Sequence, residues 1–528
     1  MTLKRRLTTI LVIALCVCGI YGVGKLGITV QNNNDETEIE DDFLFGHRET
    51  LYLWYTDEAL TDYLNSVAVS YSEYQDGVRV VPVYTSGREY LETINQASLH
   101  SDELPDLYIV SNDSLEKAYL AGLASEINLP EGVLDMDDLF PETAVNAVTY
   151  HDKQIGYPFY FETSCFLYNE TYMEDWARAQ IEAENDAQMA EEAQAQLESE
   201  GEPAGADGDG TESDTNAGGE NPEEDGGMIS EEEVDERVAE TLPKTIDDIQ
   251  AFADVYDAPE QVEAVFKWDV SDIFYNFFFV GNSIDVGGKH GDRSDSIHIY
   301  NENAIKCMRV YQNLNQFFSI DTKEISYDDV LQDFIDGKIV YTVATTDVFS
   351  KIEAAKAEGD FAYEYGISMM PDVSEELSSA SLSVTQCVVV NGYSVQKEMA
   401  NDFAVYLTEY ATDSLYTRTG KLPVYDNGDT YSDPNKAAFL EEYTCSIPMP
   451  KMIETSNFWV ELEITFAKIW DGEDANRDLK ALSEKIMSQV VGGEYEEEYI
   501  DVPEEVVEEY EDEETADDES AGAGDSED

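Results

Sequence analysis

Basic residues are scarce in this sequence. Its 528 residues include 30 Lys plus Arg against 114 Asp plus Glu, which gives a formal net charge of −84. Nucleic acid is therefore disfavoured as a partner, because neutralising phosphates requires clustered Lys and Arg. The same negative field repels anionic lipids and polymers and concentrates cations near the protein.

Cysteine and histidine are also rare, at six and five residues. Cys16 and Cys18 lie in the apolar N-terminus. Four more cysteines are widely spaced along the body of the chain: Cys165, Cys307, Cys387 and Cys445. The sequence has no CxxC pair and no HExxH motif, so it predicts no metal site, no catalytic residues and no cofactor. We expect the four body cysteines to be small buried residues, and whether any two form a disulfide stays open.

The N-terminus combines a basic start with an apolar run. The triplet KRR (4–6) precedes the apolar segment 7–24. Positive charge before an apolar segment orients it with the N-terminus inside, so the body is exported. No A-x-A cleavage site follows, and a retained anchor is favoured over a cleaved signal peptide. Residues 1–30 are thus predicted to be a membrane anchor or signal segment, and residues 31–49 a polar stalk.

Acidic residues crowd two stretches that have little apolar content. The first begins with an Ala-, Glu- and Gln-rich part that is typical of an exposed helix, polar all round, and continues as a Gly-, Asp- and Glu-rich run. Its GADGDGTESD motif is like a calcium loop in composition only, because the closing Glu is missing. Such stretches bury too little apolar area to fold. We predict an acidic low-complexity insertion at 174–240 and a disordered acidic tail at 493–528.

Strand and helix signals alternate from Thr50 onward. LYLWY (51–55), VRVVPVY (78–84) and LPDLYIV (104–110) are apolar runs rich in aromatic and β-branched residues. The segments between them carry apolar residues at helical spacing. This alternation predicts an α/β fold with parallel strands joined by right-handed crossovers.

The block YHDKQIGYPFYFETSCFLYN (150–169) is the centre of the pattern. A charged turn leads into an aromatic strand that carries one carboxylate, Glu162. Carboxylates are rarely buried without a partner, so Glu162 is expected to face solvent or a cleft. The block resembles the crossing strand of the maltose-binding-like (family 1) extracellular solute-binding proteins. In that family a G-K-x-x-x-Y-P element leads to a carboxylate and then to a strand that ends in Y-N.

Further motifs of this family follow in the same order along the chain. They are Trp54 at the end of the first strand, Pro105-Asp106 before the third strand, GLASEI (122–127), LPKTIDDI (242–249) and FIDGK (334–338). The resemblance covers nearly all of residues 50–492 apart from the insertion.

The resemblance implies a two-lobed, periplasmic-binding-protein-like fold (type II), with mixed sheets, flanking helices and crossing hinge strands. Lobe 1 would comprise residues 50–160 plus 367–410, and lobe 2 residues 161–366 plus 411–492. It also implies an extracellular monomer that closes on a small solute and delivers it to the permease subunits of an ABC transporter, without enzymatic activity. Lipidation is common in the family but disfavoured here, because Leu15 and Val17, rather than small residues, precede the two N-terminal cysteines.

The resemblance also implies a set of ligand-binding positions. Carried over one at a time, they are Asp57, Glu58, Asp113 and Glu162 on the first lobe and the crossing strand, and Trp268, Asp269, Asp347, Trp459 and Glu463 on the second lobe. Asp347 stands where an aromatic residue is usual, and Glu463 where the maltodextrin binder has a basic residue. The predicted site is therefore unusually negative.

Carbohydrate is the favoured solute, because carboxylates accept hydrogen bonds from sugar hydroxyls and aromatic faces cover the apolar side of a pyranose. A cationic solute, such as an amino sugar, polyamine or basic peptide, would gain from the negative field. A surface interaction protein that keeps the fold without transport is the third alternative. Asp57 and Glu162 could pair as in a glycosidase, but no further catalytic motif supports an enzyme. The sequence does not identify the solute.

Overall fold

The computed structural model describes residues 49–85, 87, 89–100, 104–130, 132–200, 229–318, 320 and 325–503. The predicted N-terminal membrane segment, the stalk up to residue 48, much of the insertion and the tail from residue 504 lie outside this description. None of the helices in the described ranges is both long and apolar enough to cross a bilayer.

Contacts divide the chain into two compact units, Met1–Glu49 with Gln75–Val78, and Thr50–Tyr74 with Arg79–Asp528. In the first unit the Glu49 amide donates to the Gly77 carbonyl at 2.8 Å. The features discussed below belong to the second unit, apart from Glu49 and Val78, the first residues of β1 and β2.

Ten strands in the described residues form one hydrogen-bonded sheet. Seven of them follow the order β2-β1-β3-β12-β6-β10-β7, while β11 and β13 pair with β6 and β14 pairs with β12. Their bounds are β1 (Glu49–Tyr55), β2 (Val78–Tyr84), β3 (Leu107–Ser111), β6 (Tyr157–Asn169), β7 (Ala264–Phe266), β10 (Ile339–Thr345), β11 (Tyr365–Ser368), β12 (Leu382–Val390), β13 (Leu422–Pro423) and β14 (Ile447–Pro448). Two small antiparallel pairs are β4 (Thr149–Tyr150) with β5 (Lys153–Gln154), and β8 (Asp285–Val286) with β9 (Ile297–His298).

The helices separate the strands as the sequence predicts for the N-terminal third. In chain order they are α2 (Thr61–Tyr74), α3 (Tyr90–His100), α4 (Leu115–Leu120), α5 (Met136–Leu139), α6 (Glu142–Val148), α7 (Glu170–Glu200), α8 (Glu231–Thr241), α9 (Ile246–Val255), α10 (Ile273–Asn276), α11 (Glu302–Phe318), α12 (Tyr327–Ile335), α13 (Val348–Glu358), α14 (Lys397–Val405), α15 (Leu415–Thr419), α16 (Pro434–Cys445), α17 (Phe458–Trp470) and α18 (Ala475–Val491). The LPKTIDDI motif begins α9, where Thr245 and Asp248 form a reciprocal capping box.

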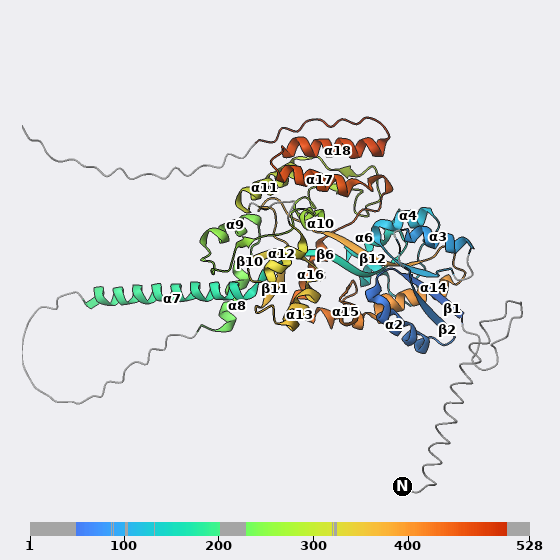
Figure 1. Ribbon diagram of the computed structural model, residues 1–528, viewed down its shortest axis with the longest axis horizontal. Helices are drawn as coiled ribbons and strands as arrows, with labels where there is room; N and C mark the ends of the chain where they lie inside the picture. Colours follow the sequence, from blue (N-terminus) through green and yellow to red (C-terminus); the bar gives the residue numbers. More distant parts are fainter. Residues whose placement is uncertain are drawn as a thin grey trace, which may run out of the picture. The chain divides into compact units, whose positions relative to one another are not determined.

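Strand β6 belongs to two parts of the sheet (Figure 1). Its residues 157–163 pair with β12 and β13, next to β3 and β1. Its residues 164–169 pair with β10 and β11 instead. The aromatic run that is most distinctive in the sequence is therefore the strand on which both parts of the sheet are built. The predicted lobe 2 includes residues 411–492 and therefore β13. In the structure β13 instead pairs with residues 160 and 161 of β6, in the part of the sheet that contains β1 and β3.

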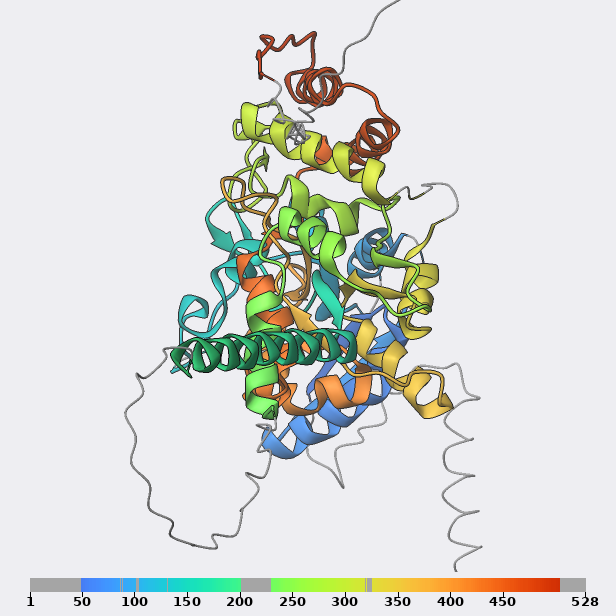
Figure 2. The same ribbon diagram turned by 90° about the vertical axis from the view of Figure 1, so that its left-hand side faces the viewer.

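The second part of the sheet carries a large apolar core. Strand residues such as Phe166 and Tyr341 are fully buried there with residues from α11, α17 and α18, and these three helices pack against one another (Figure 2). Each helix is amphipathic and turns its apolar side inward, as in α11, where Ile305, Met308 and Tyr311 are buried.

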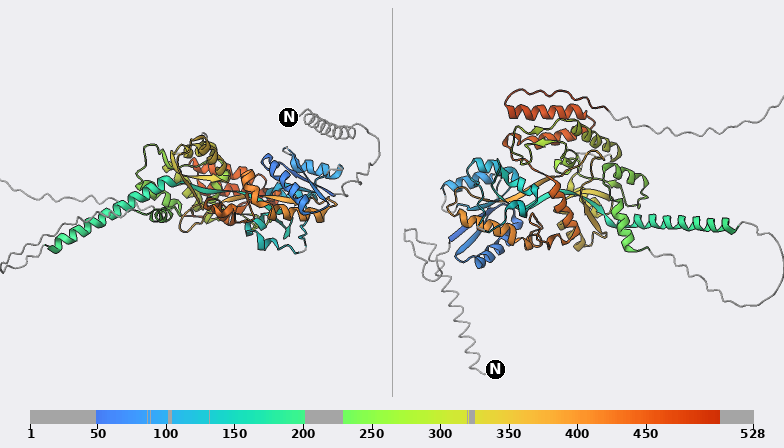
Figure 3. Two further views of the ribbon diagram at one scale, coloured as in Figure 1. Left: turned by 90° about the horizontal axis from the view of Figure 1, so that it is seen from below. Right: turned by 180° about the vertical axis from the view of Figure 1, so that it is seen from behind.

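The predicted insertion is narrower than expected. The start of α7 buries Met173, Ala177 and Ile181 in the core of the second part, and α8 buries Val234 and Val238 there. Ion pairs also join the two helices, with Arg178 2.9 Å from Glu231 and Arg237 2.8 Å from Glu184. Only the later turns of α7 extend outward as the exposed polar helix that the sequence predicts (Figure 3).

The predicted start of the disordered tail, at residue 493, needs the same kind of correction. Residues up to 503 follow α18 and pack back on the fold, because Arg309 donates to the carbonyls of Val502 and Pro503 at 3.0 and 2.9 Å. Val502 is 5% exposed. Among the body cysteines, Cys165, Cys307 and Cys387 are buried as expected, whereas Cys445 is exposed, and all four are free thiols.

Candidate functional site

The register of the strands brings predicted site residues to one edge of the sheet. Trp54 of β1 lies opposite Tyr108 of β3 in a parallel pair, so the two strands end near one another, β1 at Tyr55 with Asp57 two residues on and β3 at Ser111. Ser111 lies opposite Gln386 of β12, which in turn lies opposite Tyr160 of β6. This is the edge where the strands of open α/β sheets place their ligands.

Asp57 and Glu162 meet at this edge through a lysine that the sequence analysis missed. Lys421 Nζ lies 3.2 Å from Asp57 Oδ2 and 3.3 Å from Glu162 Oε1. It also lies 5.4 Å from the centroid of the Tyr160 ring, and the Asp57 charge helps to raise the pKa of the Tyr160 hydroxyl. We call Asp57, Tyr160, Glu162 and Lys421 the first cluster.

Burial and charge oppose each other in the first cluster. Burial, the largest single effect, lowers the pKa of the Lys421 ammonium, but Glu162 and Asp57 together raise that pKa above its usual value. Burial and the same two carboxylates raise the pKa of Tyr160. The cluster therefore holds a charged lysine between two carboxylates, with a neutral phenol beside them.

A similar arrangement stands at the end of β10. Ser164 of β6 lies opposite Thr345, the last residue of β10, in an antiparallel pair, and Asp347 follows two residues later as the N-cap of α13. Lys351 Nζ lies 2.9 Å from Asp347 Oδ2 and 2.5 Å from Asp328 Oδ1.

The aromatic rings of this second arrangement come from other segments of the chain. The Lys351 ammonium lies 4.4 Å from the centroid of the Tyr327 ring. Tyr327 donates its hydroxyl to Asp347 at 3.0 Å and stacks on Tyr275 with 4.9 Å between the ring centroids. We call Tyr275, Tyr327, Asp328, Asp347 and Lys351 the second cluster. The family resemblance indicates that Asp347 replaces an aromatic residue. No pattern in the sequence indicates that Tyr275 and Tyr327 lie close to this position.

Further carboxylates gather near α10 and α17. Asp269 is buried and accepts hydrogen bonds from the Ser271 amide and hydroxyl at 2.9 and 2.6 Å. Burial, and then the charges of Asp272 and Asp269, raise the pKa of Glu463.

Glu58 begins the short 3-10 helix η1 (Glu58–Leu60) and is exposed. Asp113 is also exposed and accepts a hydrogen bond from Ser111.

Trp268 is a core residue, which corrects the expectation that it contacts ligand. Its side chain is 0% exposed and stacks on Phe266 with 4.5 Å between the ring centroids. Its indole nitrogen donates to Asn276 Oδ1 at 2.9 Å. The ring leaves no face for a solute, and its only polar atom is already paired.

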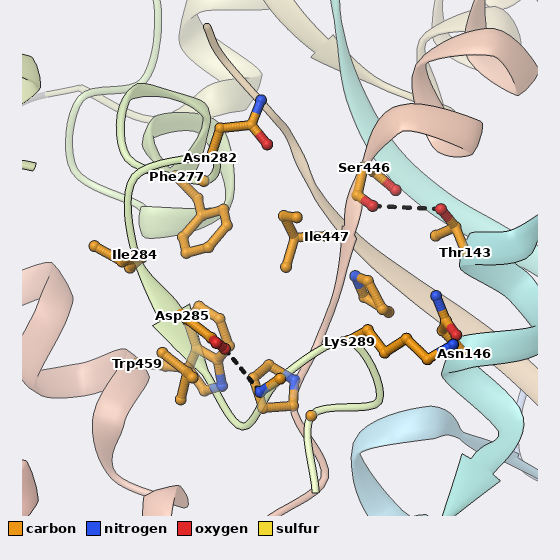
Figure 4. A pocket seen from close by; sticks show the side chains of 16 residues that line it. Thr143, Asn146, Phe277, Asn282, Ile284, Asp285, Lys289, Ser446, Ile447 and Trp459 are labelled. Carbon is orange, nitrogen blue, oxygen red and sulfur yellow. Dashed lines mark hydrogen bonds between the residues drawn. The ribbon is translucent and has the colours of Figure 1, made fainter. Parts of the chain in front are cut away.

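Trp459, by contrast, lines a cavity of about 280 Å³. Its ring packs edge-on against Phe277 with 5.5 Å between the centroids. Figure 4 shows apolar and polar side chains around this cavity, with Ile447 and Phe277 on one side and Asn146 and Lys289 on another. The cavity thus combines an aromatic wall with amide and ammonium groups, which is the composition of a small-molecule site.

A family model described as bacterial extracellular solute-binding protein matches residues 67–435. Among curated proteins, none matches the sequence.

Solved structures show the same fold at low sequence identity. An extracellular solute-binding protein from Staphylococcus aureus in complex with maltose is 17% identical, with a TM-score of 0.62, and the match covers 84% of this chain and 98% of that one. A cyclo/maltodextrin-binding protein complexed with maltotetraose is 16% identical, with a TM-score of 0.62, and the match covers 84% of this chain and 98% of that one. The maltose-binding periplasmic protein of Listeria monocytogenes is 18% identical, with a TM-score of 0.59, and the match covers 85% of this chain and 99% of that one. The predicted two-lobed, periplasmic-binding-protein-like fold is thereby confirmed.

Proposed function

Because this chain belongs to the family of bacterial extracellular solute-binding proteins, we propose that it captures a carbohydrate between two lobes and delivers it to the permease subunits of an ABC transporter. The first cluster is the observation on which this proposal mainly depends. Lys421 supplies a donor between two acceptor carboxylates at the edge where the strands end. A sugar hydroxyl both donates and accepts, so it can pair with both kinds of group at once.

Aromatic rings complete the case for a sugar. Tyr160 and the Tyr275–Tyr327 pair lie in the two clusters, and Trp459 lines the cavity. Such rings cover the apolar face of a pyranose while the polar groups fix its hydroxyls. The similar structures were solved with maltose and maltotetraose, which supports the same solute class here. Exposed Glu58 and Asp113 remain proposed contacts, as do Asp269, Asp347 and Glu463.

The cellular setting follows from the family. Its members are extracellular, so this protein works outside the cytoplasm. We propose that the N-terminal segment anchors it to the cytoplasmic membrane, that it acts as a monomer, and that it binds its solute without converting it. Ligand that touches both lobes stabilises the closed form by its differential contacts, and the permease recognises that form.

A cationic solute is the second candidate, because carboxylates outnumber cations around α10 and α17. Burial raises the pKa of Glu463, and Asp272 and Asp269 are close enough for their charges to raise it further. An amine there would relieve the mutual repulsion. Since a raised carboxyl pKa means easier protonation, binding of an amine at Glu463 would weaken as the pH falls through that pKa.

Calorimetric titration with two groups of probes tests the proposal. The neutral group is maltotriose, cellotriose, xylotriose and chitotriose, and the cationic group is glucosamine and spermidine. We expect one or more neutral sugars to bind, and Asp57→Asn and Glu162→Gln each to weaken that binding about tenfold or more, as expected for a lost hydrogen bond to a charged group. Asp295→Asn, an exposed carboxylate paired with Arg293, is the matched control.

Three results would point elsewhere. Binding of amines alone would favour the cationic solute. Hydrolysis products of the sugar in the calorimeter sample after titration would indicate an enzyme. The absence of binding by every probe would favour a surface interaction protein that keeps the fold.

A further inference from the structure

Lys421 is fixed in place from both its backbone and its side chain. It precedes β13, whose residues Leu422 and Pro423 pair with Phe161 and Tyr160 of β6. The preceding Gly420 ends α15 in a left-handed conformation, with φ of +72°, and the Lys421 amide donates to Thr419 Oγ1 at 3.1 Å. The turn therefore directs the ammonium toward Asp57 and Glu162 before any ligand arrives.

The ammonium joins three distant segments of the chain. Asp57 follows β1, Glu162 lies in β6 and Lys421 precedes β13, and the exposed fractions of their side chains are 31%, 41% and 24%. The ion pair of Lys485 on α17 and α18 is simpler, and its lysine is more exposed. Lys485 is 51% exposed and pairs with the single carboxylate of Glu461.

Two carboxylates above an aromatic face are a suitable place for an organic cation, because the charges and the ring quadrupole act together. In the first cluster the chain's own lysine already fills that place. The second cluster repeats the arrangement, with Lys351 between Asp328 and Asp347 above Tyr327. Each cluster thus has one carboxylate charge neutralised by a built-in ammonium.

We propose that Lys421 is a specificity-determining residue that makes the site select neutral polyhydroxylated solutes over amines. This inference rests on the proposed function for the identity of the site, but not for the behaviour of the lysine itself. An incoming ammonium would meet the Lys421 charge at close range and find the two carboxylates already engaged. A neutral hydroxyl instead finds a donor, since two of the three N–H groups of Lys421 have partners within the described residues.

The first experiment replaces the lysine and supplies its head group from solution. Lys421→Ala leaves Asp57 and Glu162 without their cation, and ethylammonium chloride is the probe. We expect ethylammonium to raise the melting temperature of the variant with saturation, following mass action, while wild type and Lys485→Ala show no such increase. Sodium chloride at equal ionic strength controls for screening. Equal responses of all three proteins would overturn the proposal.

The second experiment measures selectivity in the full chain. The ratio of the dissociation constant for spermidine to that for the best neutral sugar of the panel is compared among wild type, Lys421→Gln and Lys421→Arg. We expect Lys421→Gln to shift this ratio toward the amine about tenfold or more, and Lys421→Arg to keep it near the wild-type value. An unchanged ratio in Lys421→Gln would sink the proposal.

The two experiments separate this proposal from the proposed function. If wild type bound none of the sugars, the proposed function would fail, while saturable rescue by ethylammonium would still support Lys421 as the built-in cation. If wild type bound sugar but the ratio and the rescue did not depend on Lys421, the specificity role alone would fall. If Lys421→Ala did not fold, Lys421→Gln would take its place with the same amine.

Discussion

At the scale of single residues, two tryptophans show what a motif does and does not predict. Both Trp268 and Trp459 were placed in the ligand site by family resemblance. The structure buries the first against Phe266 and leaves the second at a cavity. Sequence position carries over between relatives, but the direction of a side chain depends on packing partners from distant segments, which no local pattern reports.

Substituting each tryptophan should separate stability from binding. Trp268→Ala removes a fully buried ring from the core and should lower the free energy of unfolding by about 3–5 kcal/mol. Trp459→Ala should cost less stability and weaken binding of the neutral sugar more. Urea unfolding together with calorimetric titration of both variants checks this. Equal losses of stability would place Trp459 in the core as well.

Lys451 is a buried cation outside the two clusters. Its side chain is 2% exposed and donates to the carbonyls of Asn146, at 2.9 Å, and His290. Burial lowers its pKa to about 8, while Asp292, Cys387 and Glu116 act in the opposite direction. In the unfolded chain the same lysine titrates near its ordinary pKa of about 10.4.

This difference predicts a pH dependence with a definite sign. Between pH 8 and about 10.4 the unfolded state binds more protons than the folded state, so the stability contribution of Lys451 rises with pH across that window. The free energy of unfolding of wild type minus that of Lys451→Met should therefore increase by about 3 kcal/mol from pH 7.5 to pH 10.5. Guanidinium unfolding of both proteins across this range measures it. A flat difference would mean that the lysine keeps an ordinary pKa.

At the scale of elements, the regular alternation of strands and helices was predictable because its periodicity is local. The limits of the insertion were not. The overall composition of 174–240 is polar, and it concealed that Ala177 and Ile181 continue the apolar stripe of Met173 at helical spacing in the first turns of α7. The stripe can be read from the sequence, but the sequence does not show that α8 and the core bury it, and this burial is what sets the limit of the insertion.

Two deletions distinguish these limits. Replacing residues 187–228 by a Gly-Ser linker of about eight residues keeps the buried turns and the Arg237–Glu184 pair. It should leave the melting temperature and sugar binding unchanged. Deleting 177–238 removes Ala177, Ile181, Val234 and Val238 from the core and should cost several kcal/mol or prevent folding. Circular dichroism melts compare the two. An equally stable longer deletion would restore the limits expected from sequence.

At the scale of the whole molecule, family resemblance predicted the two-lobed fold, which is confirmed, and it named the carboxylates Asp57, Glu162 and Asp347 as ligand contacts, which stay predictions. It did not predict the lysines that neutralise them. Lys421 and Lys351 come from a turn and a helix far along the chain. The pairing of β13 with β6 brings Lys421 to Asp57 and Glu162, and α13 brings Lys351 to Asp347. The charge of the site is therefore a property of the assembled sheet, and counting acids in the sequence overstates it.

Strand β6 has a thermodynamic consequence. Residues 157–163 and 164–169 of one unbroken strand pair with two different sets of strands. Neither half of the sheet can therefore unfold without disturbing a strand that the other half needs. Heating should accordingly produce one calorimetric peak whose measured enthalpy matches the van't Hoff value. Two resolved peaks would mean that the halves unravel independently, with this shared strand as a mere tether between them.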